Sequence, residues 1–285
     1  MESAKCIICN SDNSFKLIHK IKDRYSLSTT YQIKKCNCGM VMLNPRPKEA
    51  NMKKHYDYEN YHPQNRTVSI FDVFFKLAQY LNNLIKNRVI KKYFKLGNIL
   101  DYGAGDGQFQ KFMFKNGWST DIYEPILKSS FCNGKIIKDI DKIKMNYYDV
   151  ITMFHSLEHI HKVNEVLSKI NLSIKKDGIL MIAIPNYNAY ERKYFKNKWI
   201  AYDVPRHLYH FNYDSINQLL IKNNFKIVEL KPMYLDTFYN IIMSVDKSMM
   251  SFVKIIYLTL ISFYNIYRDN KQCSSMMLVC KKNEI

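Results

Sequence analysis

The sequence lacks any segment that would carry the chain into or across a membrane. Residues 1–5 (MESAK) have no apolar core of the kind found in a signal peptide. The longest apolar stretch, from Phe252 to Tyr264, is interrupted by Lys254 and is too short to span a bilayer. These absences predict a cytoplasmic protein, and in that compartment clustered cysteines indicate metal binding rather than disulfide bonds.

The sequence also lacks a block of basic residues, although its charge is strongly positive. Lysine and arginine number 43 against 25 acidic residues, which gives a net charge of +18 at pH 7. A dedicated nucleic-acid surface clusters its basic residues. Here they lie singly or in pairs, such as Lys34-Lys35 and Lys175-Lys176. A composition rich in lysine, isoleucine and asparagine, as AT-rich genomes produce, explains the charge better.

Internal repeats and low-complexity tracts are absent too, and from residue 98 onward short apolar runs alternate with amphipathic segments. The expected strands cover 98–101, 120–123, 135–137, 148–154, 178–184, 226–230 and 276–280. The expected helical segments cover 69–94, 108–116, 161–174, 214–223 and 235–268. This alternation predicts an α/β fold with a parallel sheet that is covered on both faces.

Two prolines in residues 44–47 (NPRP) break regular structure and mark a boundary. We therefore expect a small module over 1–47, a helical linker or lid over 48–95 and the main domain over 96–285.

A glycine-rich turn follows the first expected strand of the main domain. Residues 101–107 read DYGAGDG, so a glycine stands at every second position from Gly103 to Gly107. Glycine lets a ligand approach the backbone closely, and open α/β sheets bind ligands at the carboxyl ends of their strands. Glu124 ends the second strand, where it can accept hydrogen bonds from both hydroxyls of a ribose, and Asp139 follows the third. The order of these signals predicts an adenosine-containing cofactor.

The turn resembles motif I of class I S-adenosylmethionine-dependent methyltransferases. From residue 6 to about 230, the chain is similar to a bacterial family of these enzymes that has an N-terminal zinc-ribbon-like segment. The stretches that carry the resemblance are the cysteines at 6, 9, 36 and 38, and residues 44–47, 99–107, 154–160 (FHSLEHI), 184–186 (IPN) and 199–211 (WIAYDVPRHLYHF).

The resemblance implies a seven-stranded Rossmann-like sheet and a zinc-ribbon-like module, and the apolar segment 235–268 is expected to be a helical insertion near the C-terminus. It also implies methyl transfer from S-adenosylmethionine to a small molecule, such as a sugar, a lipid or a surface-glycan precursor. The acid at the position of Asp139 usually meets the adenine amino group in this fold. The expected cofactor-binding residues are Asp101, Gly103, Ala104, Gly105, Glu124, Asp139, Phe154 and His155.

Four of the seven cysteines lie in the N-terminal module. Cys6 and Cys9 form one pair and Cys36 and Cys38 another, and four thiolates suit a closed tetrahedral site for structural zinc. The second pair is Cys-x-Cys, and 26 residues separate the pairs, which leaves a reduced, metal-free cluster as the alternative. The remaining cysteines, which we expect to be ordinary core or surface residues, are Cys132, Cys273 and Cys280.

Residues 155–159 (HSLEH) follow the fourth expected strand. They match an inverted zinc-protease motif as text, but their place after the cofactor signals excludes that interpretation. They also resemble the Glu-x-x-Glu-His metal site of certain O-methyltransferases, although His155 replaces the first glutamate, which argues against a catalytic magnesium ion. We expect His155 in the active site, and Glu158 and His159 as residues that cap the next helix and fix the loop.

The segment 199–211 is expected to cover the substrate pocket. A histidine can accept the proton that leaves a hydroxyl or an amine during methyl transfer, and our candidates for this base are His207 first and His155 second. Arg206 either binds a substrate phosphate or carboxylate or pairs with Asp203. The candidate substrate-binding residues are Tyr61, Tyr187, Arg206 and His210, and plain packing is the alternative for the tyrosines, including Tyr58 and Tyr190.

The sequence therefore predicts a methyltransferase acting on an O or N atom of a small molecule, namely a sugar, a phosphorylated metabolite or a surface-glycan precursor. The alternatives are an RNA methyltransferase that uses the zinc module, a C-methyltransferase of a nucleotide-linked sugar and a non-catalytic scaffold. No basic stripe with stacking aromatics supports RNA binding. The apolar segment 235–268 is expected to cover the sheet or form a homodimer interface, with shallow membrane contact as the alternative.

Overall fold

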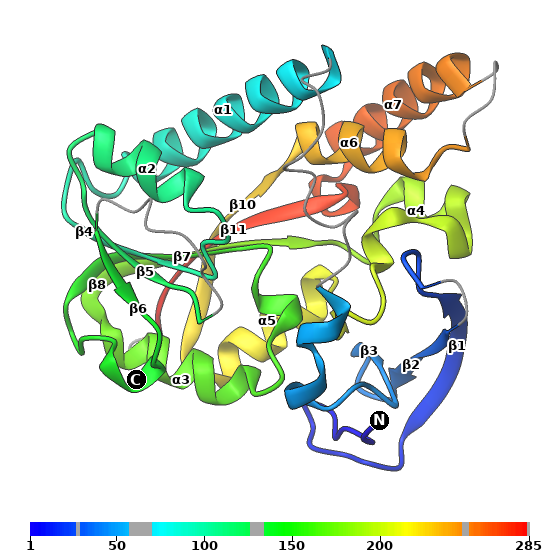
Figure 1. The fold of residues 1–285 in the computed structure, drawn as a ribbon, viewed down its shortest axis with the longest axis horizontal. Helices are drawn as coiled ribbons and strands as arrows, with labels where there is room; N and C mark the ends of the chain where they lie inside the picture. The colour runs from blue at the N-terminus through cyan, green and yellow to red at the C-terminus, as the bar shows by residue number, and fades with distance from the viewer. Residues whose placement is uncertain (27–28, 57–69, 126–133, 247–250, 284–285) are drawn as a thin grey trace.

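A seven-stranded sheet forms the centre of the computed structural model, which describes residues 1–26, 29–56, 70–125, 134–246 and 251–283 (Figure 1). The strands lie in the order β10-β11-β8-β7-β4-β5-β6. Their bounds are β4 (Asn98–Tyr102), β5 (Ser119–Tyr123), β6 (Lys135–Ile137), β7 (Tyr148–Phe154), β8 (Ile174–Pro185), β10 (Phe225–Pro232) and β11 (Ser275–Lys282). Each of the seven expected strands is present, which confirms the Rossmann-like sheet.

The sheet is mixed rather than all-parallel. The neighbouring pairs from β6 to β8 are parallel. β11, however, runs antiparallel to both β8 and β10, so the prediction of a parallel sheet was wrong for this strand. The reason lies in the connection, because Pro232 at the end of β10 pairs with Met276 near the start of β11. The helices between these strands return the chain to the end of the sheet that it had left, so no crossover is made.

Alternating side chains along the strands fill two separate cores. In β8, Ile179 and Met181 join one core, whereas Leu180 and Ile182 join the other. This follows from the two-residue period of a strand, which turns successive side chains to opposite faces. The helices on the first face are α1 (Ile70–Ile90) and α2 (Gln108–Lys115), and those on the second are α3 (Val163–Ser173) and α5 (Tyr213–Lys222) (Figure 1).

A second, four-stranded sheet joins the N-terminal module to the main domain. Its strands, in spatial order, are β1 (Phe15–Lys22), β2 (Thr30–Cys36), β3 (Val41–Leu43) and β9 (Tyr209–His210). β9 belongs to the segment between β8 and α5, and its Tyr209 pairs with Met42 of β3. The module therefore completes its sheet with residues of the main domain, which positions the 199–211 segment.

The expected helical segment near the C-terminus forms two helices, α6 (Tyr234–Ser244) and α7 (Ser251–Arg268), while α4 (Tyr190–Phe195) follows β8 (Figure 1). α7 exposes several large apolar side chains, including Phe252 and Leu260. Within the described ranges, no helix is both long and apolar enough to cross a membrane. The short 3-10 helices are η1 (Glu49–Asn51), η2 (Lys53–His55), η3 (Ile140–Lys142), η4 (Leu157–His159), η5 (Lys196–Lys198), η6 (Ile200–Tyr202) and η7 (Asn270–Gln272).

Candidate active site

The glycine-rich turn leaves β4 after Tyr102 in a conformation that needs glycine. Gly103, Gly105 and Gly107 have φ angles of +75°, +57° and +72°. A Cβ on Gly103 would lie 2.5 Å from the Cβ of Ser156, whereas a Cβ on Gly105 would meet nothing within 4 Å. The turn therefore packs tightly against the loop after β7 at Gly103, whereas there is open space next to Gly105. The open part can admit a ligand to the backbone.

The carboxylate of Glu124 faces this turn from the end of β5. Its Oε2 accepts a hydrogen bond from the N–H of Gly105 at 3.2 Å. The other predicted acid, Asp139, is exposed, and its carboxylate caps η3 by accepting from the N–H of Asp141 at 3.0 Å. Both acids thus lie at the carboxyl ends of strands, as predicted.

The first residue of the motif, Asp101, is buried beneath the turn at 4% exposure. It accepts a hydrogen bond of 2.7 Å from the hydroxyl of Thr152 on β7. Burial raises the pKa of Asp101 to about 6, against the opposing effects of Thr152 and the Lys86 ammonium. Lys86 comes from α1, and its Nζ lies 4.0 Å above the half-buried ring of Phe154. An acid, a cation and an aromatic ring therefore meet beside the turn.

His155 occupies the position directly after β7, with a φ of +50°. Its Nε2 lies 3.1 Å from Oδ2 of Asp236 on α6, and its Nδ1 lies 3.5 Å from Oε1 of Glu158. Desolvation alone would lower the pKa of His155, but Asp236 and Glu158 outweigh it and raise this pKa to about 9. Both ring nitrogens thus face carboxylates.

A second cluster lies next to His155. Glu158 is 1% exposed, and its Oε1 lies 3.9 Å from Nε2 of His207. Nδ1 of His207 lies 2.8 Å from the carbonyl oxygen of Ala201, and Nδ1 of His159 lies 3.0 Å from that of Arg206. Burial would raise the pKa of Glu158, but the three surrounding histidines lower it to about 2. The carboxylate is therefore anionic and surrounded by imidazole rings.

Comparison with known proteins agrees with this arrangement. A family model that describes a methyltransferase domain matches residues 74–230 of the 285-residue chain, which is more than half of it. The chain belongs to the class I S-adenosylmethionine-dependent methyltransferases. No curated protein matches the sequence.

Solved methyltransferase structures share the fold at low sequence identity. The 1,6-didemethyltoxoflavin-N1-methyltransferase of Burkholderia thailandensis has a TM-score of 0.52 at 13% identity, and the match covers 86% of this chain and 96% of that one. A S-adenosylmethionine-dependent methyltransferase of Archaeoglobus fulgidus has a TM-score of 0.50 at 19% identity, covering 75% and 100%. Phosphoethanolamine N-methyltransferase 2 of Haemonchus contortus has a TM-score of 0.52 at 15% identity, covering 86% and 63%.

Arg206 of the methyltransferase is fully buried and engaged by the protein. Its guanidinium donates to both carboxylate oxygens of Asp203, at 3.0 and 2.8 Å, and to Asp23 at 3.4 Å. It also donates to the carbonyl oxygens of His55 and Val204. Of the two alternatives open in the sequence, the geometry therefore favours pairing with Asp203 over substrate binding.

The other candidate substrate-binding residues, Tyr187 and His210, differ in their burial. Tyr187 is half-buried in an aromatic group, and its hydroxyl lies 3.1 Å from Nε2 of His19. His210 is 5% exposed beneath Tyr202, and burial lowers its pKa to about 3, so it is neutral. Tyr61 lies outside the described residues. Among these candidates, Tyr187 alone combines a described position with exposed surface.

The four N-terminal cysteines come together as the spacing predicted. The Sγ atoms of Cys6 and Cys38 lie 3.4 Å apart, and those of Cys9 and Cys36 lie 3.5 Å apart. All four sulfur atoms lie within 4.8 Å of one another. Tetrahedral zinc with bonds of about 2.3 Å separates its thiolates by roughly 3.8 Å, so this arrangement fits the ion. Cys273 and Cys280 are buried in the core, as expected, and Cys132 lies outside the described residues.

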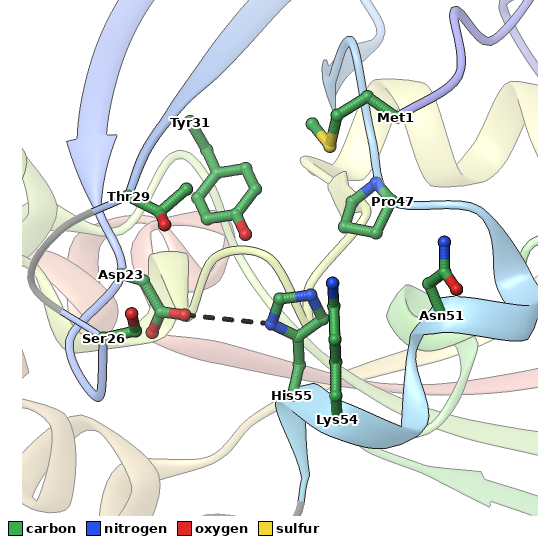
Figure 2. A pocket seen from close by; sticks show the side chains of 9 residues that line it. All are labelled: Met1, Asp23, Ser26, Thr29, Tyr31, Pro47, Asn51, Lys54 and His55. Atoms are coloured by element: carbon green, nitrogen blue, oxygen red, sulfur yellow. Dashed lines mark ion pairs between the residues drawn. The ribbon is translucent and has the colours of Figure 1, made fainter.

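A cavity of about 380 Å³ lies between the N-terminal module and residues 51–55, and it is lined by the turn between β1 and β2, by the start of β2 and by η2 (Figure 2). Oδ2 of Asp23 and Nδ1 of His55 face each other there at 4.0 Å. The same Asp23 pairs with Arg206, so this cavity borders the 199–211 segment rather than the glycine turn. Its lining residues include none of the cofactor motif.

Two residues of the candidate site, Lys86 and Asp236, were not predicted from the sequence. Lys86 lies in a helix whose apolar spacing indicated packing, and Asp236 lies in a segment taken as a hydrophobic cover. Asp236 is the one charged residue in the apolar stretch 234–245, and that feature was the available signal, whereas Lys86 stands close to Arg88 and Lys91 and has no such signal. Their roles become visible only when α1 and α6 are placed over the end of the sheet.

Proposed function

We propose that this methyltransferase transfers a methyl group to an O or N atom of a small molecule, namely a sugar, a phosphorylated metabolite or a surface-glycan precursor. The observation that carries the proposal is the contact of the glycine turn with the loop 155–156, which puts the histidine cluster next to the cofactor motif. The similar Burkholderia structure contains a small-molecule substrate together with S-adenosylhomocysteine, and this supports a small acceptor.

The proposed cofactor contacts follow from the shape of the turn. The open space at Gly105 would receive S-adenosylmethionine, and the carboxylate of Glu124 would bind its ribose hydroxyls. Asp139 would meet the adenine amino group. Asp101 and Phe154 would lie toward the methionine part, where the cofactor carries positive charge. The backbone at Gly103 and Ala104 would complete this surface.

The chemistry requires a nucleophile in line with the methyl group and a place for one proton. A lone pair of the acceptor atom forms the new bond to carbon, and the carbon–sulfur bond breaks with its electron pair moving to sulfur. We propose that the acceptor's proton passes to Nε2 of His207, because Nδ1 of His207 is held by a carbonyl oxygen at 2.8 Å. His155, with a carboxylate at each nitrogen, would instead position the acceptor.

Structural zinc at the four cysteines belongs to the same proposal. The ion would fix the turns that hold the N-terminal sheet and, through β9, the 199–211 segment. Metal analysis of the native protein tests it, and an intact fold without zinc would contradict it.

The main test is calorimetry with S-adenosylmethionine and S-adenosylhomocysteine, followed by a screen of small-molecule acceptors with product analysis. Micromolar cofactor binding and a product methylated at O or N are the expected results. Failure to bind either form of the cofactor would refute the proposal, and a C-methylated product would replace it with the alternative chemistry. RNA binding that weakens steeply with salt would favour the nucleic-acid alternative.

A further inference from the structure

The carboxylate of Glu158 is buried without a hydrogen bond. Neither of its oxygens has a hydrogen-bond partner among the described residues, although the side chain is 1% exposed. A buried carboxylate is normally paired or coordinates a metal, and within the described residues the pairing of Glu158 is with histidines alone: its Oε1 lies 3.5 Å from Nδ1 of His155 and 3.9 Å from Nε2 of His207. Glu191 offers a contrast, because it is also buried without such partners, yet burial raises its pKa to about 7 and favours the neutral acid. Glu158 has histidines around it instead.

Nε2 of His207 faces Glu158, and His159 lies in the same cluster of possible metal ligands. A carbonyl oxygen only accepts hydrogen bonds, so Nδ1 of His207 carries the proton that it donates to Ala201. Nδ1 of His159 lies 3.0 Å from both the carbonyl oxygen of Arg206 and the hydroxyl of Tyr56, and it carries the proton in the tautomer that donates to Arg206. In the neutral rings Nε2 is then the free acceptor. A backbone carbonyl on the other ring nitrogen is the usual partner of a metal-binding histidine, since it fixes the tautomer and the ring orientation.

The three side chains are held together by the fold. The N–H of Leu208 donates to the carbonyl oxygen of Glu158 at 2.9 Å, which ties the 199–211 segment to η4. One ligand atom from each of Glu158, His159 and His207 lies within 4.8 Å of the other two. Bonds of about 2.0–2.2 Å to a metal would place these atoms roughly 3–3.5 Å apart. Oε1 of Glu158 and Nε2 of His207, at 3.9 Å, are already close to that distance.

We propose that Glu158, His159 and His207 bind one divalent transition-metal ion beside the methyl-acceptor site. Two imidazoles and one carboxylate suit Zn²⁺, Fe²⁺, Co²⁺ or Ni²⁺, whereas Mg²⁺ prefers oxygen ligands throughout. Three protein ligands leave a coordination position for water or for an oxygen of the acceptor. The use of the ion in acceptor binding rests on the proposed function, but the binding of the ion itself does not. When the ion is bound, Nε2 of His207 is a ligand, so its proposed role as the base applies to the metal-free protein.

Cobalt titration of the metal-stripped full-length protein tests the proposal, because it separates this site from the cysteine cluster. Co²⁺ held by thiolates shows sulfur-to-metal charge-transfer absorption, whereas Co²⁺ held by imidazole and carboxylate does not. The wild type is expected to bind one equivalent without charge transfer, in addition to any that the cysteines bind. Absence of this equivalent in the wild type overturns the proposal regardless of any variant.

Glu158→Gln and His207→Gln are each expected to lose this equivalent, with an affinity decrease larger than the roughly 10–100-fold typical of an outer-shell partner. Glu191→Gln is the matched control, since it alters a buried, unpaired carboxyl that belongs to no cluster of metal ligands in the described chain, and it should retain the equivalent. Retention by Glu158→Gln would overturn the proposal. Calorimetry with S-adenosylhomocysteine reports separately on the proposed function, so either idea can fail without the other.

Discussion

The cofactor half of the candidate site is formed mainly by the backbone of one continuous turn. The acceptor half is formed by side chains that are distant in the sequence. The cofactor half consists of residues 101–107 and Glu124, and its geometry is set by glycines at positive φ. The acceptor half consists of His155, Glu158, His159, His207 and Asp236. Its members come from the loop after β7, from the 199–211 segment and from α6. A local sequence motif allows the cofactor half to be predicted from the sequence. The residues of the acceptor half are distant in the sequence, and only the fold brings them together.

The largest effect on the stability of the fold is expected where the two halves touch. Gly103→Ala adds a Cβ that would lie 2.5 Å from Ser156, at a φ of +75°. The left-handed conformation costs about 1–2 kcal/mol and the overlap about 1–3 kcal/mol more, so we expect a lower melting temperature and roughly 100-fold weaker binding of S-adenosylhomocysteine. Thermal denaturation and calorimetry measure both.

Gly105→Ala is the matched control for this change. Its Cβ would enter open space, so the loss of stability should stay near 1 kcal/mol, while cofactor binding falls because the cofactor needs that space. Equal loss of stability in the two variants would contradict the view that Gly103 is the point of contact.

A change in the acceptor half should leave the cofactor half intact. His207→Gln is expected to lower kcat by about 10²–10⁴-fold, the usual contribution of a general acid or base, or of a lost metal ligand. The Kd for S-adenosylhomocysteine should change by less than about twofold, because cofactor binding does not use this ring. Single-turnover kinetics with an identified acceptor and calorimetry provide the two values. A parallel loss of cofactor affinity would show that the halves are not separable.

The same contrast explains how much could be predicted. β7 was predicted at its observed bounds, 148–154, because a buried apolar run between polar segments has few other structures. β9 was missed, because a strand of two residues is defined by its pairing with β3 and not by its own pattern. Asp236 reaches the site through the placement of α6, and the direction of β11 follows from the connection around α6 and α7. These features depend on packing between segments that are distant in the sequence. The periodicity of apolar residues within one segment therefore cannot predict them.

The cofactor half should respond to pH through Asp101. Its pKa in the folded protein is about 6, above the ordinary value of 3.8, so the fold favours the protonated acid. This contribution to stability is complete below pH 3.8 and is lost as pH rises through 6. Asp101→Asn should therefore gain stability over the wild type above pH 6, on the order of 3 kcal/mol, with the difference vanishing near pH 4. Urea denaturation across pH 4–8 measures it, and a difference independent of pH would refute the assignment.

The smallest effect is expected at the adenine end, where Asp139 is exposed. Asp139→Asn removes the charge of one acceptor in a solvated position, and a hydrogen bond there is worth about 1 kcal/mol, so binding of S-adenosylhomocysteine should weaken about fivefold. The fold should not change, because asparagine can still cap η3. Asp141→Asn is the matched control two residues away, on a side chain that is 87% exposed, and it should have no effect on the cofactor. If both variants bind equally well, the adenine contact lies elsewhere, and the local part of the site ends at Glu124.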